Sequence, residues 1–123
     1  YPIFVATDET QQIVGYGYAG AHKARYGYRL TVENSVYVHH LHHQKGIGSA
    51  LPNALITHCM EDGYHQMIAV IGDAANLGSV KLHTKAGFKM VGTAPHLGFK
   101  FGQFIDVVFM QRQLNPEQDF ISQ

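Results

Sequence analysis

The residues most suited to chemistry lie together in one short stretch, residues 39–50, which reads HHLHHQKGIGSA. Its first half contains four histidines, which are common metal ligands, and its second half combines a lysine with glycines, as loops that bind phosphate do. Adjacent side chains on a strand point to opposite faces, so only some of the histidines can reach one ion. Their spacing matches neither a zinc finger nor the H-E-x-x-H motif. Solvated loop histidines are therefore favoured over a histidine-rich metal-binding domain, which stays an alternative.

The second half of this stretch predicts an anion site. It follows a β-rich segment and opens a segment with helical periodicity. Glycines let the backbone approach a phosphate without a Cβ in the way, and the free N–H groups of the first helical turn point at the anion. Lys45 adds a mobile positive charge. A tight strand-to-helix turn built on Gly46 and Gly48 is the alternative, and the spacing alone leaves both open.

A second candidate is the run YRLTVE, in which Arg29, Thr31 and Glu33 are two residues apart and are expected to share one strand face. A carboxylate at the rim of a sheet, beside an arginine, can serve as a general base or form half of a structural ion pair. The ion pair is the commoner explanation of an Arg/Glu pair at this spacing. The residues alone do not choose between the two.

The elements that must position these candidates are expected in the order β-β-β-α-β-α-β-β. Strands are predicted in PIFVAT, IVGYGY and TVENSVYVHH, the first two forming a hairpin, and a buried strand parallel to the third is predicted in QMIAVIG. The helix after Gly46 ends at a Gly63 C-cap, and the next helix begins at an Asn76 N-cap and ends at Gly87. Two final strands, FKMVG and FIDVVFMQRQL, are joined by a glycine-containing loop. The order predicts an α/β layer structure with a right-handed βαβ crossover.

Composition favours a single globular domain over residues 1–123, because 46% hydrophobic and 15% charged residues are typical of soluble proteins. Nine Lys and Arg residues balance nine Asp and Glu residues, so we expect no general attraction to nucleic acid or to a membrane surface. No apolar run is long enough to span a bilayer. With Cys59 as its one cysteine, the chain cannot form an internal disulfide, which favours the reducing cytoplasm.

Three segments together resemble one family: TVENSVYVHHLHHQKGIGSALPNALI, QMIAVIGDAANLGSVKLHTKAGF and VGTAPHLGFKFGQFIDVVFMQ. They are similar to the GNAT superfamily of N-acetyltransferases, and more narrowly to the phosphinothricin and methionine sulfone/sulfoximine N-acetyltransferases of bacteria. The resemblance runs from about Ile13 to Leu114. It implies an α/β protein with the GNAT fold, a mixed central β-sheet flanked by helices, here lacking the N-terminal strand and first two helices with which the family begins.

By position, the resemblance also implies the cofactor residues. The family binds acetyl-CoA; the backbone of residues 36–38 would line its acetyl and pantetheine arm, and the loop at 44–49 would hold its pyrophosphate. Where the family's loop usually carries arginine and often glycine, this chain has His43 and Gln44. The full set of implied cofactor-binding residues is Val36, Tyr37, Val38, Gln44, Lys45, Gly46, Ile47, Gly48, Ser49, Asn76 and Ser79.

The resemblance implies three further roles. Glu33 matches the carboxylate proposed as general base for the amine, and Arg29 is placed to recognise the acidic end of the substrate. His83 takes the place of the tyrosine that gives a proton to the departing thiolate in many relatives, with a structural histidine as the alternative. Cys59 has no base at helical spacing beside it, which favours direct transfer over a covalent enzyme intermediate.

The expected activity is transfer of an acetyl group from acetyl-CoA to the primary amine of a small amino acid or analogue, such as phosphinothricin or methionine sulfoximine, without a metal. The resemblance also implies a homodimer. The alternative from a different class is a non-catalytic acyl-CoA-binding module.

Overall fold

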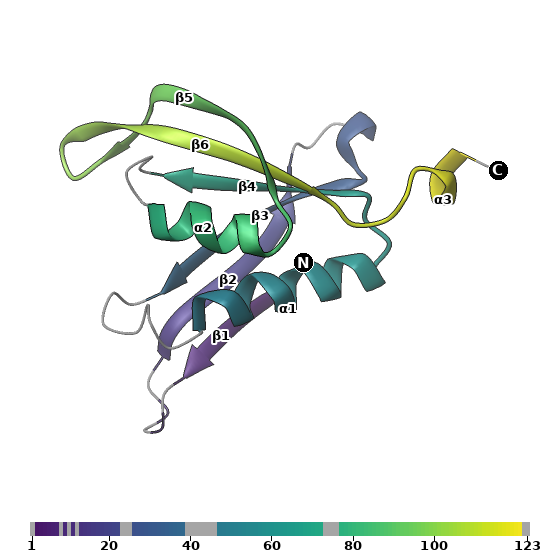
Figure 1. Ribbon diagram of the computed structural model, residues 1–123, viewed down its shortest axis with the longest axis horizontal. Helices are drawn as coiled ribbons and strands as arrows, with labels where there is room; N and C mark the ends of the chain where they lie inside the picture. The colour runs from purple at the N-terminus through teal and green to yellow at the C-terminus, as the bar shows by residue number, and fades with distance from the viewer. Residues whose placement is uncertain are drawn as a thin grey trace.

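The computed structural model describes residues 2–7, 9, 11, 13–22, 26–38, 47–72 and 77–121 of the chain. Six strands form one sheet in the order β1-β2-β3-β4-β6-β5 (Figure 1). The strands are β1 (Ile3–Thr7), β2 (Ile13–Ala21), β3 (Thr31–Val38), β4 (Gln66–Gly72), β5 (Lys89–Lys100) and β6 (Gln103–Gln113). The helices are α1 (Ile47–Glu61), α2 (Leu77–Lys85) and the short α3 (Gln118–Ile121), with a 3-10 turn, η1, at Tyr26–Tyr28.

The order of the elements along the chain is the one that the sequence predicts, and the strand pairing gives a mixed sheet. β1 and β2 form an antiparallel hairpin, β2 pairs antiparallel with β3, and β6 pairs antiparallel with both β4 and β5. Of the pairings among the described strands, only that of β3 with β4 is parallel, and α1 makes the crossover between these two strands. The parallel strand predicted in QMIAVIG is confirmed, and the mixed sheet flanked by helices is the expected fold class.

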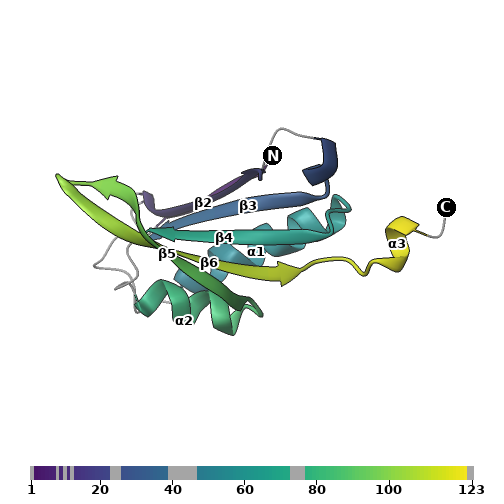
Figure 2. The same ribbon diagram turned by 90° about the horizontal axis from the view of Figure 1, so that it is seen from above.

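Both long helices lie on one side of the sheet (Figure 2). The strand residues that face them are buried, as the alternation along β4 shows: Met67, Ala69 and Ile71 are buried, while the residues between them are partly exposed. α1 packs Leu55 and Cys59, both 0% exposed, into this layer. The core therefore lies between the sheet and the two helices. None of the described helices is long and apolar enough to cross a membrane.

Glycines end both long helices. Gly63 and Gly87 have positive φ angles of 87° and 95°, a conformation that glycine adopts without a Cβ clash. In each case the glycine N–H donates to the carbonyl three residues back, and the next N–H donates to the carbonyl five residues back. This is the hydrogen-bond pattern of a Schellman cap. Both predicted C-caps are confirmed.

The prediction for the final hairpin is wrong in its extent. FKMVG was expected as a short strand before a loop, but β5 continues for 12 residues to Lys100. Its pairing with β6 shifts between Ala94 and Gly98, and His96, between them, has a positive φ of 55°. Such an irregularity interrupts the alternating pattern by which a strand is recognised in a sequence. The turn Phe101–Gly102, in which both residues have positive φ, closes the hairpin.

Candidate active site

The parallel strands β3 and β4 separate toward their C-terminal ends. Their paired residues end at Asn34, opposite Ala69. Beyond this point β3 continues to Val38 and β4 continues to Gly72. The edge of β3 that faces β4 over residues 36–38 therefore has no strand partner in the part of the chain that the structure describes. Backbone N–H and C=O groups left open in this way are available to a ligand.

A helix N-terminus lies at the same end of the molecule as this opening. The C-terminal ends of β3 and β4 and the N-termini of α1 and α2 all point to that end (Figure 1). The N–H groups of the first turn of α1, at Ile47, Gly48 and Ser49, have no acceptor within the helix, and the helix dipole favours an anion beside them. The backbone thus fits a ligand with an extended arm and a phosphate at one end.

Part of the predicted site lies outside the described residues. These residues are Gln44, Lys45, Gly46, Asn76 and the four histidines between positions 39 and 43. For Val36, Tyr37, Val38, Ile47, Gly48 and Ser49, the structure describes the backbone and not the side chains. Where side chains are described, no group of three or more His, Cys, Asp or Glu residues is placed to hold a metal ion.

Glu33 has a partner that sequence reasoning missed. Its Oε1 lies 2.7 Å from Nδ1 of His22, the residue that follows β2. Val32 and Asn34 are buried toward the helices, so Glu33 projects from the opposite face of the sheet. No periodicity relates two residues that are 11 positions apart. The only signal that could have found the pair is the register of β2 with β3, which places Gly20 opposite Glu33.

Arg29 lies in the turn between η1 and β3 and is exposed. Thr31 is the first residue of β3 and shares the face of Glu33. The expectation that all three residues share one strand face is therefore wrong for Arg29, because the strand begins only at Thr31. The ion pair that the structure gives Glu33 is with His22.

His83 is 3% exposed on α2 and lies edge-on to Phe88, with the ring centroids 5.0 Å apart. Its Nδ1 donates a hydrogen bond of 2.8 Å to the backbone oxygen of Ser79, since a carbonyl only accepts. Burial lowers the pKa of His83, opposed in part by this hydrogen bond, so the ring is neutral at pH 7. Its Nε2 is buried and has no partner among the described residues. This arrangement favours the structural alternative for His83.

Cys59 is buried in the core layer on α1 and is unsuited to act as a nucleophile. Burial, and then the negative charge of Asp62, raise the pKa of its thiol from 9.0 to about 11. The reactive species of a cysteine is the thiolate, which this environment disfavours. The geometry therefore agrees with direct transfer rather than a route through a covalent cysteine intermediate.

The raised pKa of Cys59 predicts a loss of stability at alkaline pH. The folded protein keeps the thiol proton to about pH 11, whereas the unfolded chain releases it near pH 9.0, so the folded state loses stability between these two values. We expect the free energy of unfolding of the wild type to fall over this range relative to that of Cys59→Ala. Urea titrations of both proteins at several pH values measure the difference. Parallel pH curves would contradict the raised pKa.

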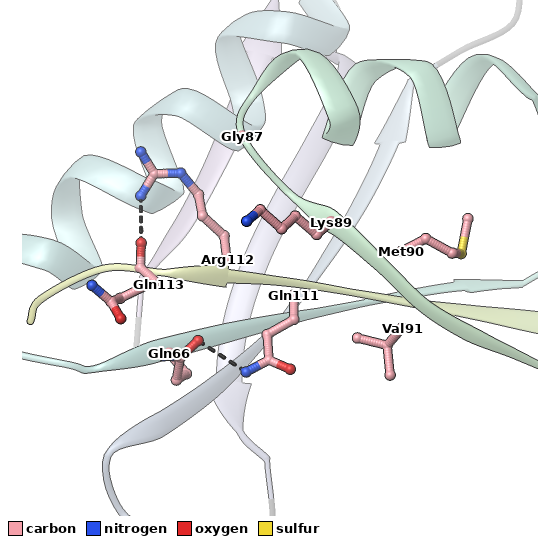
Figure 3. A pocket seen from close by; sticks show the side chains of 8 residues that line it. All are labelled: Gln66, Gly87, Lys89, Met90, Val91, Gln111, Arg112 and Gln113. Atoms are coloured by element: carbon pink, nitrogen blue, oxygen red, sulfur yellow. Dashed lines mark hydrogen bonds between the residues drawn. The ribbon is translucent and has the colours of Figure 1, made fainter. Parts of the chain in front are cut away.

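A shallow hollow of about 580 Å³ lies where β4, β6 and the start of β5 meet (Figure 3). It is on the face that carries Glu33, because Glu33 is opposite Ile68, Ile68 is opposite Gln111, and Gln111 is opposite Lys89. Within it, Nε2 of Gln111 donates to Oε1 of Gln66 at 3.0 Å. The hollow thus adds amides and a lysine to this face. Its near side is on β4, next to the strand that carries Glu33, and its far side is on β5, three strands from Glu33.

Comparison with known proteins identifies the family of the chain. The acetyltransferase (GNAT) domain matches residues 1–109. The chain belongs to the GNAT acetyltransferase family. This GNAT chain is 41% identical over 116 residues to the L-methionine sulfoximine/L-methionine sulfone acetyltransferase of Pseudomonas aeruginosa, covering 94% of this chain and 67% of that protein. It is 38% identical over 112 residues to the phosphinothricin N-acetyltransferase of Alcaligenes faecalis, covering 91% of this chain and 57% of that protein.

Solved GNAT structures share the fold. A phosphinothricin acetyltransferase from Sinorhizobium meliloti, in complex with acetyl-CoA, superposes with a TM-score of 0.85 at 44% sequence identity. The match covers 94% of this chain and 62% of that protein. The resemblance seen in the sequence is therefore confirmed at the level of family and fold, and the chain spans about two thirds or less of the length of these relatives.

Proposed function

We propose that this GNAT chain is an N-acetyltransferase that moves an acetyl group from acetyl-CoA to the primary amine of a small amino acid or analogue. The observation that carries the proposal is the separation of β3 and β4 beyond Asn34 and Ala69, which opens the backbone of residues 36–38 beside the N-terminus of α1. Relatives that act on methionine sulfoximine and phosphinothricin support the acceptor class.

The backbone supplies most of the cofactor contacts in this proposal. The N–H and C=O groups of residues 36–38 that point to the open edge of β3 would bind the pantetheine arm, and the Val38 N–H would hold the thioester oxygen, where negative charge develops during transfer. Residues 44–49, which include the first turn of α1, bind the pyrophosphate through backbone N–H groups and Lys45. Ser79, in the first turn of α2, contacts the arm together with Asn76. Bound acetyl-CoA supplies the acetyl thioester, and no metal takes part.

Glu33 acts as the general base. An alkylammonium must lose a proton before its nitrogen can attack, and Glu33 accepts that proton, directly or through one water. The C–N bond then forms and the C–S bond breaks, without a covalent enzyme intermediate, and the departing thiolate takes up the second proton of the nitrogen to leave as CoA. Arg29 binds the acidic end of the acceptor. The acid role of His83 stays a prediction, and it requires the buried ring to gain a second proton at Nε2.

We propose the domain organisation, oligomeric state, location and partners of the protein on the same basis. The protein acts as a single domain over residues 1–123, forms a homodimer, and works in the cytoplasm, where its one cysteine stays reduced. Its partner is a small amine, and the balance of nine basic with nine acidic residues supports neither nucleic acid nor a membrane as a partner.

Titration of the chain with acetyl-CoA in a calorimeter, with EDTA present, tests cofactor binding. We expect saturable binding at about one site per chain, because the open backbone of β3 and the first turn of α1 lie at the same end of the molecule. Lys45→Ala removes a charge beside the pyrophosphate and should weaken binding by about 2- to 10-fold. Lys85→Ala, at the C-terminal end of α2 and so at the opposite end of that helix from the site, makes the same charge change and should leave the affinity unchanged.

Release of CoA in the presence of L-methionine sulfoximine then tests transfer. Amine-dependent release supports the proposed function. Binding of acetyl-CoA without turnover of any primary amine favours the acyl-CoA-binding alternative. Failure to bind acetyl-CoA would contradict both.

A further inference from the structure

His22 is held beside Glu33 by two independent contacts. Its Nδ1 lies 2.7 Å from Oε1 of Glu33, with side-chain exposures of 21% for His22 and 36% for Glu33. Its ring also packs edge-on against that of Tyr28 in η1, with centroids 5.7 Å apart and an interplanar angle of 72°. The imidazole is thus fixed between the carboxylate and an aromatic ring, which limits its rotation.

The hydrogen bond leaves one carboxylate oxygen of Glu33 for another partner. An ionised carboxylate only accepts hydrogen bonds, so Nδ1 of His22 must carry the proton whether the ring is neutral or charged. Within the described part of the chain, the hydrogen bond of Glu33 engages Oε1 alone. Oε2 can therefore accept a proton from a substrate ammonium or from a bridging water while Oε1 stays anchored.

Space for such a partner exists next to the carboxylate. Gly20 on β2 is directly opposite Glu33, and a Cβ built on Gly20 would meet nothing within 4 Å. On the other side, the β4 residue opposite Glu33 is Ile68, which carries no polar side chain. A small amine above Gly20 would thus meet one carboxylate, oriented by one histidine, with the apolar side chain of Ile68 on the far side of Glu33.

We propose that His22 is a positioning residue for acetyl transfer, which anchors Oε1 of Glu33 so that Oε2 faces the amine of the acceptor. This inference rests on the proposed function, because it acts through Glu33 as the general base. A carboxylate free to rotate among several orientations spends only part of its time in reach of the ammonium, so anchoring it raises the rate of the chemical step. The anchoring does not contribute to the binding of acetyl-CoA.

Two substitutions of His22 distinguish a positioning role from a purely structural role. His22→Phe keeps a ring against Tyr28 but removes the donor, and it should lower kcat by about 10-fold while leaving KM for acetyl-CoA unchanged. His22→Asn places an amide N–H near the position of Nδ1, and it should keep kcat within about 3-fold of the wild type. His58→Phe is the matched control, because His58 on α1 forms the other histidine–carboxylate pair among the described residues, 3.0 Å from Asp62, which follows the helix.

A double-mutant cycle with Glu33→Gln completes the test, measured by CoA release with acetyl-CoA and L-methionine sulfoximine. If His22 acts through Glu33, His22→Phe adds nothing to the loss already caused by Glu33→Gln. The melting temperatures of all variants, recorded in parallel, report any loss of folding.

The outcomes distinguish the two proposals. A fall in kcat for Glu33→Gln and for His22→Phe, with rescue in His22→Asn and no additive loss in the double mutant, supports the positioning role. A fall for Glu33→Gln alone, or equal losses in His22→Phe and His22→Asn, overturns the role of His22 and leaves the proposed function standing. A wild type without turnover, or Glu33→Gln at the wild-type rate, overturns the proposed base and the positioning role together.

Discussion

Replacing Glu33 by glutamine should lower kcat for amine acetylation by about 100-fold or more, which is the range that a general base contributes. Glutamine keeps the size of the side chain and can still lie beside His22, but its amide cannot accept the proton of the ammonium. Affinity for acetyl-CoA should be unchanged, because Glu33 precedes the point at which β3 and β4 separate. Steady-state kinetics and calorimetry on the same preparation measure both quantities.

Glu61→Gln is the control for this substitution. Glu61 is exposed at the C-terminal end of α1, and the change removes the same charge. It should leave kcat within about 2-fold of the wild type, as surface substitutions away from a site usually do. Glu33→Gln with wild-type activity at every pH would remove Glu33 as the base.

Replacing Leu55 by alanine is expected to have the largest effect on stability. Leu55 is 0% exposed at the centre of α1, in the core cluster that also contains Cys59, Met67 and Ala69. Removing a buried leucine side chain loses its transfer free energy and leaves a cavity, at a combined cost of about 2–5 kcal/mol. The free energy of unfolding from urea titration should fall by that amount. The loss should be accompanied by a lower melting temperature.

Thr57→Ala provides the comparison on the same helix. Thr57 is exposed two residues from Leu55, so its truncation removes no buried contact. Its free energy of unfolding should stay within about 0.5 kcal/mol of the wild type. If Leu55→Ala proved as stable as Thr57→Ala, α1 would not pack against the sheet as described.

The ends of the elements were predictable because they depend on local chemistry. Gly63 and Gly87 end helices through a positive φ that few other residues adopt, and both were found from the sequence. The buried strand QMIAVIG was found from its continuous apolar run. The C-terminal half of β5 was missed, since the shift of register between Ala94 and Gly98 interrupts the alternation on which strand prediction depends.

The candidate site was predictable only where its function rests on backbone and motif. The start of α1 directly after Gly46 was expected from the change of period in the sequence, and Glu33 was singled out from its place on the strand. The contact of residues 36–38 with the cofactor arm was expected from the family resemblance and stays a prediction. The sequence left Glu33 open as either a general base or half of an ion pair with Arg29. Its observed partner is His22, which no spacing in the sequence connects to Glu33.

The sequence by itself therefore determined the order of the elements, the C-caps of α1 and α2, and the family to which the chain belongs. Only the tertiary structure decided that β3 and β4 separate after Asn34 and that His22 meets Glu33. The physical reason is that the period of a strand fixes which face a side chain occupies, whereas its neighbours across the sheet depend on register. Register is set jointly by the turns and by packing of the whole sheet against α1 and α2, which no single segment encodes.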